Sequence, residues 1–134
     1  MAVAITTRED GSPRASVVNA GVLDHPATGE PVVGFVTRGG VRKLDDLRDR
    51  PSATVVFRSE WDWVAVEGDV TLLGPDDNPN ALDPPALLEV IRSVYAAAAG
   101  GSPADWAELD ESFLAERHTV VLIHPQRVYP TEPR

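Results

Sequence analysis

Hydrophobic and polar residues alternate over the first part of the chain, which is typical of β-strands whose two faces differ. The alternation predicts strands at residues 2–8 and 13–23, joined at Asp10-Gly11, a pair that two-residue hairpin turns prefer. Residues 31–37 (PVVGFVT) are almost continuously apolar, which predicts a third strand buried on both faces. We therefore expect the chain to open with three strands.

Residues 40–50 have a different period, with apolar side chains at every third position: Val41, Leu44 and Leu47. This spacing predicts a short amphipathic helix with charged residues between its apolar ones. Pro51 ends the helix, because proline has no N–H with which to continue the hydrogen-bonding pattern.

Two further strands are predicted after this helix, at residues 52–58 and 61–74. The longer strand alternates, and one of its faces carries Val64, Val66, Val70 and Leu72. The opposite face carries Trp61, Trp63, Ala65, Glu67 and Thr71. Gly68, inside this strand, predicts a bulge or the close approach of another backbone.

The period changes again at Pro84, where the apolar residues fall on one helical face as far as Gly100-Gly101. Ser102 followed by Pro103 resembles the start of a second helix. Its apolar face comprises Trp106, Leu109 and Phe113. Residues 118–124 (HTVVLIH) predict the last strand.

The predicted fold is mainly β with flanking helices, in the order β-β-β-α-β-β-α-α-β. Six strands that mostly follow one another through short turns favour a closed antiparallel barrel with helices packed outside it, since closure removes unpaired edge strands. The chain has no internal repeat and no linker, so we expect residues 1–134 to form a single domain.

The composition of the chain argues against several classes of function. A formal net charge of −9 and a pI near 4.6 argue against a nucleic-acid partner, because binding to phosphate backbones needs a broad cationic surface. No apolar run approaches the ~18 residues of a membrane span, and the first residues have no signal-peptide pattern. We therefore expect a cytoplasmic protein without a membrane partner. The absence of cysteine excludes disulfides and thiolate chemistry.

Residues suited to catalysis are scarce. The three histidines, His25, His118 and His124, do not have the spacing of a metal site. No serine lies in a G-x-S-x-G motif, and no glycine-rich nucleotide-binding loop follows a strand. If the protein is an enzyme, we expect a cofactor to carry the chemistry, with no metal and no catalytic side chain.

The segment TRGGVRKLDDLRDRP, residues 37–51, holds five of the twelve basic residues, including the only lysine. Gly39 and Gly40 permit a tight turn before the predicted helix, whose first turn has N–H groups without partners and therefore favours an anion such as phosphate. Arg42 and Lys43 lie in that turn, where cations are unfavourable unless an anion compensates them.

A second interpretation of this segment is a solvated helix face. Asp45, Asp46 and Asp49 are spaced to pair with Arg42, Arg48 and Arg50 along such a face. Physical chemistry alone leaves both interpretations open.

Here the sequence also resembles a family. It resembles the split-barrel flavin/deazaflavin oxidoreductases in the order of its elements and motifs. These are a strand, a glycine-rich turn, VRKLDDLRDRP, a strand, WDWVAVEGDVTLLG, and then LLEVIRSVYAAAAGGSPADWAELDESFLAERHTVVLIHPQRVY. The oxidoreductases of this family are relatives of pyridoxamine 5'-phosphate oxidase, and the nearest branch uses the deazaflavin coenzyme F420. The resemblance runs from Val3 to Tyr129. It implies a six-stranded, Greek-key split β-barrel and a homodimer with cofactor sites between the subunits.

The resemblance also implies roles for single residues. The family's basic segment falls on VRKLDDLR, which makes Lys43 the phosphate-binding lysine. The neighbouring candidates for the cofactor phosphate are Arg42, Arg48, Thr37, Arg38 and Gly39. Two departures stand out. Asp46 occupies the family's asparagine position and adds a negative charge. The sequence also begins almost inside the first strand, so we expect either a start assigned late or a cleft wall without the helix that usually precedes that strand.

Candidates for contact with the cofactor ring come from strand faces that would line the cleft: Trp61, Trp63, Ser16 and Val18. Two tryptophans on the outward face of a barrel strand need cover, which a ring or a dimer partner would supply. Packing in a dimer interface is therefore the alternative role for the tryptophans.

The resemblance implies a reductase that passes a hydride from reduced F420 to a conjugated small-molecule substrate. The alternatives are an FMN-dependent oxidase or reductase of the same fold, and a protein that binds F420 or FMN without turnover.

Overall fold

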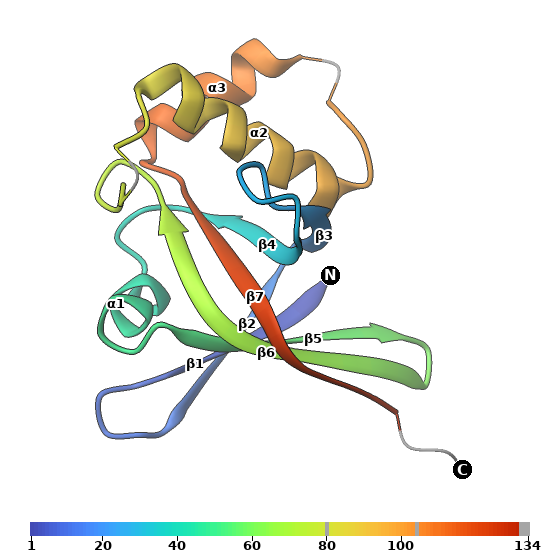
Figure 1. Ribbon diagram of the computed structural model, residues 1–134. Helices are drawn as coiled ribbons and strands as arrows, with labels where there is room; N and C mark the ends of the chain where they lie inside the picture. Colours follow the sequence, from blue (N-terminus) through green and yellow to red (C-terminus); the bar gives the residue numbers. More distant parts are fainter. Residues whose placement is uncertain (80, 104, 132–134) are drawn as a thin grey trace.

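A computed structural model describes residues 1–79, 81–103 and 105–131 of the chain. It is mainly β, with one antiparallel sheet and three helices (Figure 1). The strands are β1 (Ala2–Thr7), β2 (Pro13–Val18), β3 (Ala20–Asp24), β4 (Pro31–Thr37), β5 (Ser52–Ser59), β6 (Asp62–Leu73) and β7 (Thr119–Pro130). The helices are α1 (Arg42–Asp49), α2 (Pro84–Ala99) and α3 (Trp106–Ala115).

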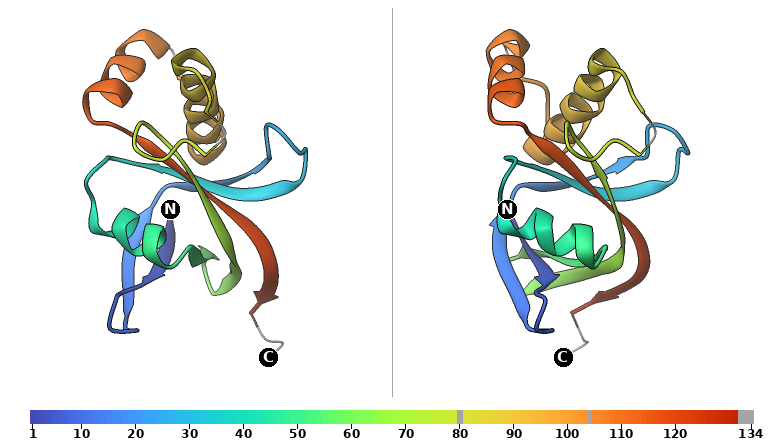
Figure 2. Two further views of the ribbon diagram at one scale, coloured as in Figure 1. Left: turned by 60° about the vertical axis from the view of Figure 1, so that its left-hand side comes forward. Right: turned by 90° about the vertical axis from the view of Figure 1, so that its left-hand side faces the viewer.

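The sheet has seven strands rather than the six expected, in the order β2-β1-β5-β6-β7-β4-β3. The predicted strand at 13–23 is divided at Asn19: its first half pairs with β1 and its second half with β4. The two edge strands are thus consecutive in the chain. Strand β2 pairs with β1 and strand β3 pairs with β4, so the two edge strands are not hydrogen-bonded to each other. The sheet curls into a half-barrel rather than the closed barrel expected (Figure 2).

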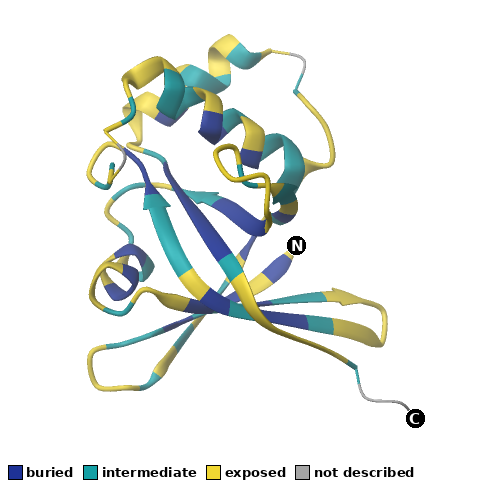
Figure 3. Cartoon of the chain, viewed as in Figure 1, coloured by how far each residue is buried: buried dark blue, intermediate teal, exposed yellow. Residues whose placement is uncertain are grey.

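Two hydrophobic clusters lie on the two sides of this sheet. Helix α1 lies on one side and α2 and α3 lie on the other (Figure 2), and the buried residues are concentrated in the strands between them and on the inner faces of the helices (Figure 3). In the first cluster, the fully buried Leu44 and Leu47 of α1 pack with Phe35 of β4 and Val55 of β5. The amphipathic spacing of residues 40–50 thus produced the expected buried stripe. The second cluster lies between the sheet and α2 and α3, and includes Ile91, Val94, Phe113, Val120 and Leu122.

The pairing of β6 with β7 confirms the expected role of Gly68. The register shifts between Glu67 and Gly68, and a Cβ atom on Gly68 would lie 1.8 Å from the carbonyl oxygen of His124. The last strand is longer than the predicted 118–124 and continues to Pro130. Its second half is exposed, so no hydrophobic alternation indicated it, and main-chain pairing with β6 holds it extended.

Helix α2 matches its prediction, with Asp83 accepting a hydrogen bond from Ala86 N at its start and Gly100 at φ 79° after its end. The predicted start of the next helix at Ser102-Pro103 was wrong. Helix α3 begins at Trp106, because the Asp105 carboxylate accepts a hydrogen bond from Ala107 N and supplies the cap. None of the described helices is long and apolar enough to cross a membrane.

Candidate functional site

The turn between β4 and α1 is fixed against the connection from α3 to β7. Gly39 N donates a 3.0 Å hydrogen bond to the carbonyl oxygen of Glu116, and a Cβ atom on Gly39 would lie 2.7 Å from the carbonyl oxygen of Arg117. Only glycine fits this approach, because the contacting atom belongs to the backbone. Gly40 follows at φ 78°, a left-handed conformation that favours glycine. The turn therefore sets where α1 begins.

Helix α1 begins without a side-chain cap. Val41 occupies the N-cap position and makes no side-chain hydrogen bond to the first turn. Leu44 N donates a 3.2 Å hydrogen bond to the carbonyl oxygen of Val41, so the N–H groups of Arg42 and Lys43 are the ones that keep their capacity to bind an anion, which the helix dipole favours there.

Lys43 lies in this first turn and is half-buried. Its Nζ atom lies 5.9 Å from the centroid of the Phe35 ring, and burial lowers the pKa of the ammonium group. Within the part of the chain that the structure describes, Lys43 has no acidic partner within salt-bridge distance. An ammonium group that has lost part of its hydration gains from a bound anion.

Arg38 and Arg42, which are both exposed, also form no salt bridge with any described residue. We call Arg38, Arg42 and Lys43, together with the uncapped first turn of α1, the basic cradle. The solvated-helix interpretation is met in part. Arg48 lies 3.1 Å from Asp45 and Arg50 lies 3.9 Å from Asp49, whereas Arg42 forms no salt bridge with a described residue.

Arg48, by contrast, is engaged within the protein. Its guanidinium group forms a fork with the Asp77 carboxylate at 3.0 and 2.7 Å and also lies 3.1 Å from Asp45. The hydrogen bonds to Asp77 raise the pKa of Arg48 further. Arg48 therefore joins α1 to the loop after β6, and its donors are largely in use.

Asp46 points away from solvent, into the space between α1 and the β1–β2 hairpin. Its Oδ2 atom accepts hydrogen bonds of 2.7 Å from Thr6 Oγ1 and from Arg14 Nε. These bonds, chiefly the one from Arg14, keep the pKa of Asp46 below its ordinary value although burial opposes this. The negative charge at the family's asparagine position is thus compensated inside the protein. Sequence reasoning missed Arg14, because 32 positions separate it from Asp46 and no local pattern links them.

The two predicted ring-contacting tryptophans lie far from the basic cradle. Trp61 lies in the turn between β5 and β6 and is 73% exposed, whereas Trp63 lies in β6, is 38% exposed and meets the Tyr129 ring edge-on at 6.2 Å. Strand β5 separates helix α1 from the turn that carries Trp61 (Figure 1). The eight residues of β5 span roughly 25 Å. A single chain therefore does not bring the tryptophans to the cradle.

The candidates on β2 have different surroundings. Val18 is buried in the same hydrophobic cluster as Phe35 and Leu44, beneath α1. Ser16 is half-buried and lies opposite Ala4 of β1. Thr37, the last residue of β4, is half-buried beside the glycine turn. Thr37 and Val18 are thus closer to α1 in the fold than either tryptophan is.

No protein-family model matches the sequence, and a comparison with curated proteins also finds no match. Solved structures do match. A conserved hypothetical protein of Mycobacterium tuberculosis is 16% identical with a TM-score of 0.70, over 98% of this chain and 76% of that one. A pyridoxamine 5'-phosphate oxidase-related, FMN-binding protein of Nostoc punctiforme is 18% identical with a TM-score of 0.67, over 98% of this chain and 73% of that one. An F420 reductase is 14% identical with a TM-score of 0.59, over 96% and 87%.

The Nostoc protein is related to pyridoxamine 5'-phosphate oxidase, the enzyme whose relatives the sequence resembles. At this level of identity the similarity establishes the shared fold. Function must be argued from the residues of the site.

Proposed function

We propose that this protein is an oxidoreductase that binds reduced coenzyme F420 and reduces a conjugated small organic molecule. The observation that carries the proposal is the basic cradle: three cations that form no salt bridge with a described residue lie at, or just before in the chain, an uncapped helix start, in a chain with a net charge of −9. Such a local cationic site suits a small anion such as a phosphodiester.

The residues of the cradle would divide the binding between them. Lys43 and the first N–H groups of α1 would hold the phosphate, and Arg38 and Arg42 would attract the acidic tail of the cofactor. Arg48 has a different task in this proposal: its fork with Asp77 anchors α1 and so fixes the direction of the helix start. When bound, the deazaflavin supplies the hydride. The protein binds and orients the two reactants, and solvent supplies the proton.

A second copy of the chain would complete the site. Trp61, Val17 and Val128 are large apolar side chains that are more than half exposed, and Trp63 and Tyr129 are exposed to a lesser degree. Apolar area of this kind is typically covered by a partner. We therefore place the cofactor in a cleft between the subunits of a homodimer, in the cytoplasm, with the tryptophans as ring contacts or as interface residues.

FMN is the alternative cofactor, because it also carries a phosphate and one similar structure is an FMN-binding protein. The third possibility is binding of either cofactor without turnover.

Titration of the purified protein with F420 and with FMN, followed by fluorescence, tests these candidates. Tighter binding of F420 than of FMN, and oxidation of reduced F420 that depends on an added conjugated substrate, are the expected results. A yellow protein that retains FMN through purification would assign the site to FMN. A folded protein that binds neither cofactor would overturn both enzyme functions.

A further inference from the structure

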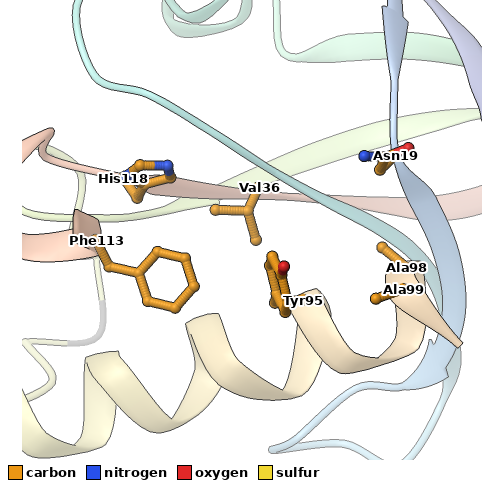
Figure 4. Close-up of a pocket in the computed structure, with 7 residues that line it drawn as sticks. All are labelled: Asn19, Val36, Tyr95, Ala98, Ala99, Phe113 and His118. Atoms are coloured by element: carbon orange, nitrogen blue, oxygen red, sulfur yellow. The ribbon is translucent and has the colours of Figure 1, made fainter. Parts of the chain in front are cut away.

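A cavity of about 140 Å³ lies between β4 and the helices α2 and α3 (Figure 4). Phe35 of β4 faces α1, whereas the next residue, Val36, faces α2 and α3, because successive side chains of a strand point to opposite faces. The cavity lies at Val36, between the sheet and these two helices. Its lining comprises Asn19, Val36, Tyr95, Ala98, Ala99, Phe113 and His118. The cavity is therefore on the other side of β4 from Lys43, although Arg38 of the basic cradle is near enough to His118 for its charge to act on the imidazole.

Aromatic rings form much of the wall. The Phe113 ring meets the Tyr95 ring at 5.7 Å and the His118 ring at 5.2 Å, both at edge-to-face angles. Val36, Ala98 and Ala99 complete the apolar lining. Engineered apolar cavities of about 150 Å³ hold a benzene-sized molecule, so this cavity has the capacity for a single ring.

Polar atoms of three side chains give the cavity a capacity for hydrogen bonding. These side chains are Asn19, Tyr95 and His118. The His118 side chain is 14% exposed and lines the cavity, while its Nδ1 atom is buried. The part of the imidazole that faces the cavity adds to the polar capacity of this wall.

The lining carries no charged side chain. Burial also lowers the pKa of His118, so its imidazole is neutral near pH 7 and both donates and accepts hydrogen bonds. A charged ligand would lose its hydration here without a counter-ion among the lining side chains, and the two charges that act on His118, those of Glu116 and Arg38, have opposite signs.

We propose that this cavity is a binding site for a neutral, single-ring aromatic molecule that carries a hydroxyl group, with the ring against Tyr95 and Phe113 and the hydroxyl group hydrogen-bonded to His118. The site takes phenol-like molecules and rejects aromatic carboxylates.

The test uses the full chain, titrated with phenol, toluene and benzoate to about 10 mM, which covers the affinity expected of ligands this small. Side-chain resonances of His118 and Tyr95 are followed by NMR. We expect saturable shifts with phenol, weaker binding of toluene, and no saturation with benzoate. The absence of a saturable shift with phenol, or equal affinity for benzoate, would overturn the proposal.

Two alanine-to-leucine variants locate the site. Ala99 is exposed and lies at the rim, so Ala99→Leu fills the cavity without disturbing the buried core. Ala107→Leu is the matched control on the exposed surface of α3. We expect at least ten-fold weaker phenol binding in A99L and unchanged binding in A107L. Equal affinities in the two variants would contradict the assignment.

A third variant tests the hydrogen bond. His118→Leu removes the imidazole and keeps an apolar wall. With Tyr95 as the reporter, we expect phenol to bind about five- to ten-fold more weakly, the usual effect of one lost hydrogen bond, and toluene to change less than two-fold. An equal loss for both ligands would show that His118 contributes shape alone.

Discussion

Arg14 Nε lies 2.7 Å from Asp46 Oδ2, although β2 and α1 are far apart in the sequence. The Asp46 side chain is 7% exposed, and Thr6 of β1 donates to the same oxygen. One carboxylate therefore ties the first hairpin to the helix whose first turn carries Lys43. This relationship makes Asp46 a structural residue whose charge is compensated within the protein.

Removal of the Asp46 charge should destabilise the fold. Asp46→Asn leaves Arg14 with a neutral partner, and hydrogen bonds to charged groups contribute about 1.5–3 kcal/mol. We expect a decrease of that size in the free energy of unfolding, measured with urea at pH 7. Asp45→Asn is the control, because the Asp45 side chain is 71% exposed and its pair with Arg48 contributes about 1 kcal/mol or less. Equal effects of the two variants would show that the Arg14 contact does not stabilise the fold.

The same contact predicts a dependence on pH. The pKa of Asp46 is lower in the folded protein than its ordinary value of 3.8. The stabilisation is therefore fully present at pH values above 3.8 and is lost as the pH falls through the lower pKa of the folded state. We expect the difference in unfolding free energy between wild type and Asp46→Asn to be constant from pH 7 to 5 and to shrink toward pH 2. A difference that does not change over this range would assign the effect to packing.

Lys43→Ala should weaken binding of the preferred cofactor about ten- to hundred-fold, because a charged hydrogen bond of roughly 1.5–3 kcal/mol is lost. Fluorescence titration measures this change. Arg127→Ala removes one positive charge from a side chain that is 76% exposed and controls for the change in net charge. If both variants weaken binding equally, Lys43 makes no specific contact.

The variant Arg48→Ala should show whether Arg48 anchors α1 or binds the cofactor. Arg48 is paired with Asp77, whose side chain is 15% exposed, so its loss should lower the unfolding free energy by about 1–3 kcal/mol. Cofactor affinity should change less than three-fold. Loss of affinity as large as in Lys43→Ala, in a variant that stays folded, would place Arg48 in direct contact with the cofactor.

Gly68→Ala should be strongly destabilising, by about 1–3 kcal/mol or more, because the added Cβ atom meets the backbone of His124 at 1.8 Å and β6 and β7 must separate. Gly101→Ala is the matched control, since a Cβ atom there meets nothing within 4 Å. Thermal unfolding of the two variants measures the difference. Similar midpoints would show that the β-bulge tolerates a side chain.

Most elements could be predicted from the chain alone because their evidence is local. The strand at 31–37 and the buried stripe of α1 follow from the spacing of apolar residues over a few positions. Where the evidence was not local, prediction failed. The second half of β7 has no buried face. The start of α3 depended on whether Ser102 or Asp105 supplied the cap.

The same distinction between local evidence and long-range contacts applies to the candidate site. The sequence by itself determined that a cluster of cations follows a glycine turn and begins a helix, because turn and helix geometry depend on neighbouring residues. Only the tertiary structure decided that Arg48 is engaged by Asp77, that Arg14 compensates Asp46, and that His118 lines a cavity with Tyr95. These contacts join residues far apart in the chain. Their formation depends on how the sheet curls and how the helices pack on it, which no local pattern records.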